Sequence, residues 1–358
     1  MKITLQTALC EQFEIRYPLF LAGMAGGPST PELTAAVSEA GGLGTLGAAY
    51  MEPEAIRAAV RRIRELTAAP FGVNLFVFQP GDDNARIEEV QSELNKMRNH
   101  LGIPIASGNE VQTPNWFEKQ FEVLLKEKVP VISTAFGVLP APFMHAAKSS
   151  GLKVVSMVTT VREALLAQEI GCDAIVAQGS EAGGHRGTFV IDVHPMGANI
   201  GTMALVPQIV DSVTIPVIAA GGIMDGRGLA AALALGAQGV QMGTRFLTAI
   251  ESGTNAAYRK ALLASDEEST VLTKAFSGRP ARGINNAFNQ QWEASGVAPL
   301  AFPTQNTVTR DIRNAAGKQQ QAEYLSLWAG QGTRMLTAEN TAKQIVDEII
   351  NQAAALID

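Results

Sequence analysis

The chain has 358 residues, more than the ~250 typical of one α/β barrel, which favours one barrel with an accessory lobe over two equal domains. With 46% hydrophobic and 17% charged residues, it has ample material for a large core and too little charge for a disordered chain. A net charge of −6, scattered Lys and Arg, and no apolar run of ~18 residues argue against nucleic-acid binding and against a membrane span.

The N-terminal stretch ITLQTALC is too short and too polar for the core of a signal peptide. Cys10 and Cys172 lie far apart and belong to no CxxC pair. These features predict a cytoplasmic protein whose thiols stay reduced.

Short apolar runs alternate with longer amphipathic stretches, which is typical of βα units around a parallel sheet. Strands are predicted at 18–23, 43–47, 71–77, 130–134, 153–157, 173–177, 216–220 and 239–242. Helical spacing of apolar residues lies between them at 31–40, 53–66, 140–149, 160–170 and 226–235. Eight strands at this rhythm favour a closed (β/α)8 (TIM) barrel, with a doubly wound open sheet as the alternative.

Three segments break this rhythm: 78–112, which contains a polar helix, the Gly-rich 179–200, and the long polar 250–335. Segments that follow barrel strands lie on the face that carries active sites, so we expect these insertions to form a lid. The predicted organisation is a barrel over 1–249 that includes the first two insertions, and an accessory substrate or lid region over 250–335. In the last part, 336–358, an amphipathic helix capped by Thr337 is expected to pack on the barrel.

The segments PVIAAGG (216–222) and QMGTR (241–245) each end a buried strand in glycine just before a predicted helix. Their backbone N–H groups, a hydroxyl and two helix N-termini would face one phosphate. The loops after strands seven and eight are also the usual phosphate site of such barrels, although glycines that only permit turns are the alternative. The candidate phosphate ligands are Gly221, Gly222, Gly243 and Thr244.

A second motif, AQGSEAGGHRG (177–187), follows the sixth predicted strand. Gln178 leaves the strand at the barrel mouth, where its amide can hydrogen-bond a planar heterocycle. Gly183 and Gly184 remove side chains where a flat ring would lie against the backbone. His185 follows them on a loop and can exchange a proton near neutral pH or hold an anion, so it is the candidate catalytic residue.

Two more strand ends supply candidate cofactor ligands, Met24 in AGMAG and Asn74 in GVNLF. Glu181 and Arg186, which flank the histidine, are expected to be solvated loop residues. No metal site is predicted, because no His, Cys or carboxylate cluster has ligand spacing. The remaining histidines are expected to be structural: His100, His145 and His194.

These motifs, together with PLFLAGMAGGPSTPELTAAVSEAGGLGTLG and SLWAGQG, resemble those of the nitronate monooxygenases, formerly called 2-nitropropane dioxygenases, over about 18–332. The resemblance implies an FMN-binding barrel with an added substrate lobe and places the catalytic histidine at His185. It also implies that an alkyl nitronate, or a nitroalkane, reacts with O2 to give a carbonyl compound and nitrite. The residues that it assigns to FMN are Asn74, Gln178, Gly183, Gly222, Gln241, Met242, Gly243 and Thr244.

The chain departs from the family pattern at two places: Ala135 precedes the Phe-Gly pair where the family has a histidine, and Phe302 stands where a tyrosine is common. These departures leave the FMN assignment intact and leave the particular substrate open. Two related activities also compete, a flavin-dependent enoyl-[acyl-carrier-protein] reductase, which has similar strand-end motifs, and an NAD(P)H:quinone reductase. SLWAGQG and the insertion at 78–112 favour the nitronate reaction over the enoyl reductase, whereas no residue excludes a nicotinamide donor and the quinone reductase stays open. A non-catalytic flavin- or phosphate-binding barrel is the remaining alternative, and a histidine among glycines argues against it.

Overall fold

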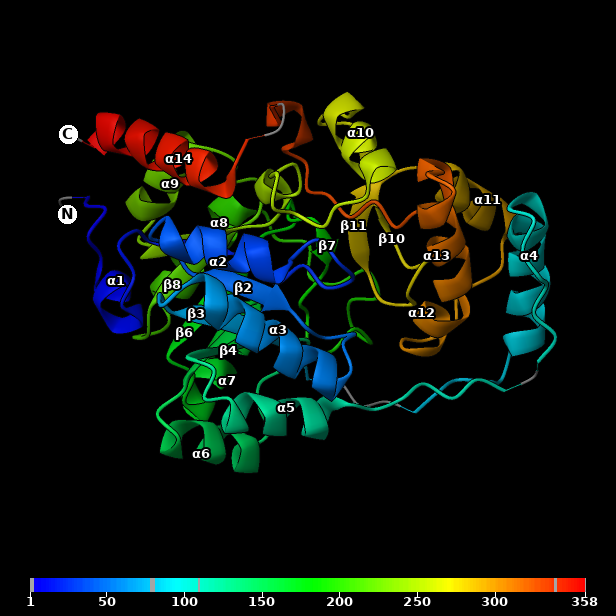
Figure 1. Ribbon diagram of the computed structural model, residues 1–358, viewed down its shortest axis with the longest axis horizontal. Coiled ribbons are helices and arrows are strands. Elements are labelled where there is room, and N and C mark those ends of the chain that lie inside the picture. The colour runs from blue at the N-terminus through cyan, green and yellow to red at the C-terminus, as the bar shows by residue number, and fades with distance from the viewer. Residues whose placement is uncertain (1–2, 78–80, 109, 338–339, 358) are drawn as a thin grey trace.

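The computed structural model describes residues 3–77, 81–108, 110–337 and 340–357. Its main sheet has eight parallel strands in the order β1-β9-β8-β6-β5-β4-β3-β2. A parallel bridge between Phe20 and Leu43 joins β1 to β2, so the sheet comes round on itself and the predicted barrel is confirmed (Figure 1). The strands are β1 (Leu19–Leu21), β2 (Gly44–Gly47), β3 (Phe71–Phe76), β4 (Val131–Ala135), β5 (Lys153–Val158), β6 (Ala174–Gln178), β8 (Val217–Ala220) and β9 (Gly239–Met242).

Helices cover the outside of the barrel because each turns an apolar side toward it. In α3 (Pro53–Leu66), Ile56, Val60 and Ile63 recur at helical spacing and are fully buried. Pro53 stands in the first turn, where a backbone N–H would have no partner within the helix. The other barrel helices are α1 (Ala8–Phe13), α2 (Pro31–Glu39), α5 (Phe117–Lys126), α6 (Ala141–Ser149), α7 (Val161–Ile170), α8 (Thr202–Val210) and α9 (Gly226–Ala234).

The C-terminal helix α14 (Ala342–Ile357) packs against both α9 and α2, in the ring position that would follow β9. The predicted cap, Thr337, is wrong because the helix begins several residues later. Thr341 and Gln344 cap it reciprocally: Gln344 N donates to Thr341 Oγ1 at 3.2 Å, and Thr341 N donates to Gln344 Oε1 at 2.8 Å. The residues of α14 that are buried against the barrel are Ile345, Val346, Ile349, Ile350 and Ala353.

A lobe with its own apolar core stands beside the barrel (Figure 1). Phe276, Phe288 and Trp292 of the lobe pack with Val90 and Leu94 of α4. The helix of the 78–112 insertion therefore belongs by packing to the lobe, although the sequence grouped it with the barrel. The lobe contains α4 (Ile87–His100), α10 (Ala256–Ala264), β10 (Thr270–Thr273), β11 (Ala281–Ile284), α11 (Ala287–Ser295), α12 (Thr304–Val308), α13 (Arg310–Lys318), η2 (Ala322–Tyr324) and η3 (Thr333–Met335).

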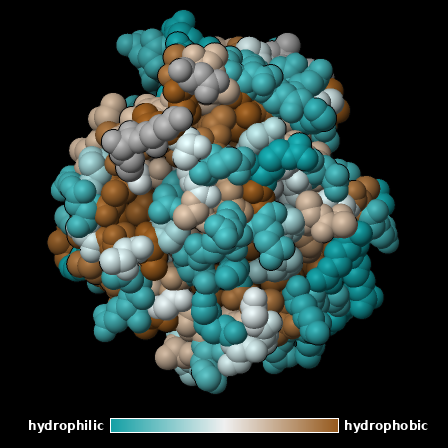
Figure 2. Space-filling model, turned by 90° about the vertical axis from the view of Figure 1, so that its left-hand side faces the viewer, coloured by the Kyte–Doolittle hydropathy of each residue, from teal (hydrophilic) through white to brown (hydrophobic). Residues whose placement is uncertain are grey.

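The barrel and the lobe are joined through a small antiparallel sheet of order β10-β11-β7. Its third strand, β7 (Gly184–His185), comes from the loop after β6, and His185 pairs with Ala281 of β11. Within the described ranges, no helix is both long and apolar enough to cross a bilayer. Figure 2 shows the end of the molecule opposite the lobe, where hydrophilic side chains cover much of the surface with hydrophobic areas between them.

Candidate active site

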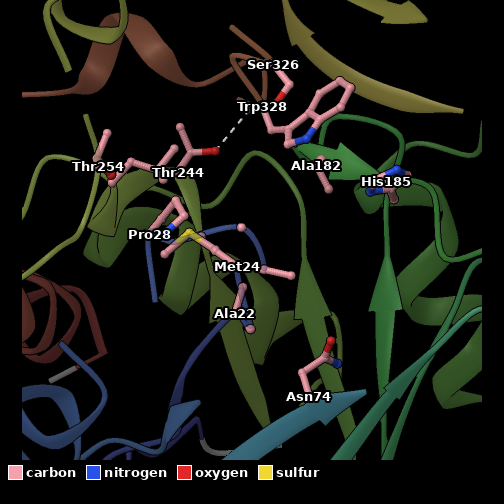
Figure 3. A pocket seen from close by; sticks show the side chains of 18 of the residues that line it. Ala22, Met24, Pro28, Asn74, Ala182, His185, Thr244, Thr254, Ser326 and Trp328 are labelled. Carbon is pink, nitrogen blue, oxygen red and sulfur yellow. Dashed lines mark hydrogen bonds between the residues drawn. The ribbon is translucent and has the colours of Figure 1, made fainter. Parts of the chain in front are cut away.

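A cavity of about 720 Å³ lies where the carboxyl ends of the barrel strands meet the lobe, within the range of ~300–1,000 Å³ usual for ligand sites. Figure 3 shows side chains from distant parts of the chain around this space, among them Asn74, Thr244 and Trp328. Every site residue predicted from the sequence lines it: Met24, Asn74, Gln178, Gly183, Gly184, His185, Gly221, Gly222, Gln241, Met242, Gly243 and Thr244.

The histidine loop is held in place by backbone geometry and by one amide. Gly184 has φ 74°, a conformation that L side chains rarely adopt. A Cβ on Gly183 would lie 2.5 Å from the backbone of Gly330, so the loop requires glycine there. Gln178 Nε2 donates to the His185 carbonyl at 2.9 Å, and Gln178 Oε1 accepts from Gly187 N at 2.8 Å. Its amide thus orients the loop, a role that the sequence did not predict.

The ring of His185 is half-buried and neutral at physiological pH. Burial, together with the smaller effect of the positive charges of Arg279 and Arg313, lowers its pKa from 6.5 to about 3. His185 Nε2 lies 2.9 Å from Ser277 Oγ, whose own hydroxyl donates to the Arg279 carbonyl at 3.0 Å. Because the serine proton is used in that bond, we assign the imidazole proton to Nε2. This assignment leaves Nδ1 as the nitrogen that can accept a proton.

Aromatic rings surround the imidazole. The ring centroids of Phe136 and Trp328 lie 5.6 and 5.5 Å from that of His185, and Phe76 and Phe302 follow at 6.0 and 6.4 Å. Phe136 has φ 71°, an uncommon conformation for a bulky residue, and such strain often occurs at functional sites. The surroundings of the histidine are therefore apolar, which explains its lowered pKa.

The backbone N–H groups that were predicted to bind a phosphate lie in loops. The prediction that two helix N-termini also face this phosphate is wrong. Helix α9 begins at Gly226, and the carboxylate of Asp225 already accepts from its first N–H groups. After β9 there is only a three-residue 3-10 turn, which has no appreciable dipole. Among the described residues, no hydrogen-bond acceptor takes up the backbone N–H groups of Gly221, Gly222, Gly243 and Thr244.

The remaining candidates differ in how they meet the cavity. Asn74 Nδ2 donates to Ser133 Oγ at 2.8 Å, which fixes the amide within the second half of β3. Met24 lies in the loop after β1, and a Cβ on Gly243 would come within 3.5 Å of its sulfur. Met242 is different, because its side chain is buried in the main core and only its backbone can reach a ligand.

Glu181 and Arg186 are structural residues, and the expectation that they are solvated is wrong. Arg186 is fully buried and donates to the carbonyls of Gly179 at 2.7 Å, Gln178 at 2.9 Å and Ala198 at 3.2 Å. The Glu181 carboxylate accepts from the first N–H of α8 at 2.9 Å, where it satisfies the helix N-terminus. Both residues hold the loop that carries His185.

The cavity is electropositive. Helix α13 contributes Arg310, Arg313 and Lys318 to its wall, while Glu181 is the one acidic side chain among the described lining residues. The sequence did not single out these cations because α13 lies in a stretch without clear periodicity. No group of three or more His, Cys, Asp or Glu side chains in the described part of the chain is arranged to hold a metal ion. An anionic ligand suits this charge distribution.

The nitronate monooxygenase family model matches residues 6–352 of the chain. A probable nitronate monooxygenase of Staphylococcus aureus (strain Newman) is 43% identical over 348 residues, which cover 96% of each chain. The solved structure of nitroalkane oxidase from Streptomyces ansochromogenes is similar with a TM-score of 0.90 and 38% identity, over 98% of both chains. FabK from Thermotoga maritima is similar with a TM-score of 0.78 and 31% identity, over 99% of this chain and 98% of that chain.

Proposed function

The chain belongs to the nitronate monooxygenase family and is an oxidoreductase, and on this premise we propose that it oxidises alkyl nitronates with O2 to carbonyl compounds and nitrite, with FMN bound in the cavity. The observation that carries the proposal is the neutral His185 in an apolar, electropositive cavity of suitable size. A nitronate is a small anion, so the charge of the wall favours it over a neutral nitroalkane.

The residues present fit FMN. One group of free N–H donors, on Gly222, Gly243 and Thr244, suits a single phosphate, and the chain has no GxGxxG fingerprint for a dinucleotide. The Thr244 hydroxyl accepts from Gly330 N at 3.0 Å and keeps its own hydrogen for a phosphate oxygen. Asn74 and the glycines of the histidine loop would hold the ring system. When bound, FMN supplies the capacity to accept electrons from the substrate.

The chain's own residues bind and orient the substrate. The neutral Nδ1 of His185 can accept the α-proton of a nitroalkane, whereas a nitronate has already lost it and needs only to be held. The aromatic rings around His185 exclude water from the reacting carbon. Ala135 and Phe302, the two departures from the family pattern, join Phe136 in an apolar cluster. We therefore propose that the hydrocarbon part of the substrate lies there.

Aerobic turnover with propane 2-nitronate tests this proposal. The purified holoenzyme should form nitrite and acetone together, and flavin released by heat should chromatograph as FMN. Protein stripped of its flavin is the matched control and should form neither product until FMN is restored. Recovery of FAD, or no nitrite from the holoenzyme, would contradict the proposal.

We also propose a cytoplasmic location, which the two free, buried cysteines support.

A reductase is the second candidate, because the similarity to FabK also extends over nearly the whole chain. The likeness to nitroalkane oxidase is greater both in TM-score, 0.90 against 0.78, and in identity, 38% against 31%. A reductase would oxidise NADH or NADPH in the presence of an enoyl thioester or a quinone. Nicotinamide oxidation without any reaction with nitronates would favour this second candidate.

A further inference from the structure

Tyr50, in the loop between β2 and α3, lines the cavity, and no sequence motif indicated it. The hydroxyl is buried and has no hydrogen-bond partner among the described residues. Its ring is anchored edge-on against Phe76, with centroids 5.5 Å apart. A buried polar atom without a partner is rare in folded proteins, and at a cavity wall a ligand can supply the missing bond.

Arg313, on α13, brings a cation to the same cavity. Its Nη2 donates to Asn306 Oδ1 at 3.0 Å, and no acidic side chain of the described residues forms a salt bridge with it. Burial lowers the pKa of Arg313 to about 10, so it stays protonated at neutral pH. The Asp311 carboxylate, whose charge also acts on Arg313, forms its salt bridge with Arg98, and among the described residues Arg313 has no salt-bridge partner. A partly desolvated cation of this kind favours an anionic ligand.

Electrostatic interactions connect these two groups with His185. Burial raises the pKa of Tyr50 to about 12, and the nearby charges of Arg313 and Arg310 oppose this effect. The charge of Arg313 also lowers the pKa of His185, so Arg313 lies within electrostatic reach of both side chains. Phe76 stands between the tyrosine and the imidazole, with its ring centroid 6.0 Å from that of His185.

We propose that the Tyr50 hydroxyl and the Arg313 guanidinium bind the oxygens of the substrate's nitro group, so that its reacting carbon lies toward His185. This inference rests on the proposed nitronate oxidation. Phe76 and Ala135, which pack with Tyr50, are apolar and cannot donate to the nitro oxygens, whereas the cations Arg313 and Arg310 both act on Tyr50. Tyr50 and Arg313 are thus positioning residues that determine preference for a nitro group over an uncharged polar one.

The test uses FMN-loaded Tyr50→Phe, Arg313→Met and Arg313→Lys proteins, with two probes. Nitrite alone, titrated by calorimetry, reports anion binding, and propane 2-nitronate reports KM and kcat. We expect Tyr50→Phe and Arg313→Met each to raise the nitrite Kd and the nitronate KM by roughly 10- to 100-fold, the usual effect of losing a hydrogen bond to a charged group. Arg313→Lys should recover part of the loss, and kcat should change less than KM.

Two matched controls remove the same groups outside the cavity. Tyr17→Phe deletes a phenol hydroxyl and Arg162→Met deletes an exposed positive charge, and neither position lines the cavity. Both should leave the nitrite Kd and the nitronate KM unchanged. If Arg313→Met fails to fold, Tyr50→Phe still decides, since it removes one oxygen and keeps the ring against Phe76.

The outcomes separate the two proposals. Normal nitronate oxidation with an unchanged nitrite Kd and KM in Tyr50→Phe would overturn the inference and leave the proposed function standing. A wild-type protein that forms no nitrite from nitronate would overturn the proposed function. In that case calorimetry with nitrite still tests the site: tight binding that Tyr50→Phe weakens supports it, and binding that does not respond to Tyr50→Phe refutes it.

Discussion

Replacement of His185 by asparagine separates proton transfer from substrate binding. Lowering the imidazole pKa from 6.5 to about 3 corresponds to about 5 kcal/mol against the protonated ring. In the cavity His185 is therefore a weak base, and the wild-type enzyme should use a preformed nitronate far more efficiently than the neutral nitroalkane. The ring still offers Nδ1 to an α-proton, which the asparagine amide cannot accept with useful basicity.

For His185→Asn we expect kcat/KM with 2-nitropropane to fall by about 10²-fold or more, the usual loss when a general base is removed. With propane 2-nitronate kcat/KM should fall by no more than about tenfold. No proton has to be removed from this substrate, and the change affects at most one hydrogen bond, worth roughly 1 kcal/mol. FMN content should not change, because the expected phosphate donors lie on other loops. Initial rates of nitrite formation on both substrates give the ratio. Equal losses on the two substrates, or no loss on either, would refute the role of His185 as the base.

Four further predictions concern the phosphate cradle, the pH dependence of turnover, the pH dependence of stability, and the histidine loop. Gly222→Asp should weaken FMN binding at least about 100-fold, because Gly222 has φ 70° and the new carboxylate would face both the phosphate and Glu181. An unchanged flavin content would show that the phosphate binds elsewhere. The kcat/KM for nitronate should show no ionisation of His185 between about pH 5 and 7, and a fall with an apparent pKa near 6.5 would contradict its burial. In the unfolded chain His185 binds a proton below about pH 6.5, whereas in the folded protein it stays neutral down to about pH 3. This residue therefore makes the free energy of unfolding decrease as the pH falls from 6.5 to 3. His185→Asn should make that free energy depend less on pH. Arg186→Met should lower the free energy of unfolding by about 2–4 kcal/mol, as measured in denaturant titrations, because it removes a hydrogen-bond donor from three carbonyl groups. A change below about 0.5 kcal/mol would show that those hydrogen bonds are unimportant for stability.

The barrel could be predicted from the sequence because its strands are short apolar runs that alternate with amphipathic helical stretches. All predicted site residues line one cavity for the same reason: parallel strands of a closed barrel end on one face. Asn74, Gln178 and Gly243 are far apart in the chain, but Gln178 ends its strand, Gly243 follows one, and Asn74 lies in the second half of β3. Strand-end position was therefore sufficient to bring them together.

Other features depend on long-range contacts that no local pattern reports. Tyr50 and Arg313 lie in segments without a recognisable motif. Tyr50 follows a barrel strand, whereas Arg313 reaches the cavity only because the lobe docks on the barrel. Arg186 resembles a solvated loop residue until three carbonyls converge on it. Helix α4 is polar in composition, yet Val90 and Leu94 provide an apolar side that fits the lobe. Met242 was predicted to bind the cofactor because of the motif that contains it, although the strand directs its side chain into the core.

Anaerobic mixing of the holoenzyme with three reductants, each alone, tests the central claim most directly. Propane 2-nitronate, NADH and NADPH are added in turn while the visible absorbance of the flavin is followed, and O2 is then admitted. If this cavity is built for a small anion held beside a neutral His185, the nitronate should bleach the flavin, and nitrite should appear once O2 is present. Bleaching by NADH or NADPH, with none by the nitronate, would contradict the account and identify the enzyme as a reductase.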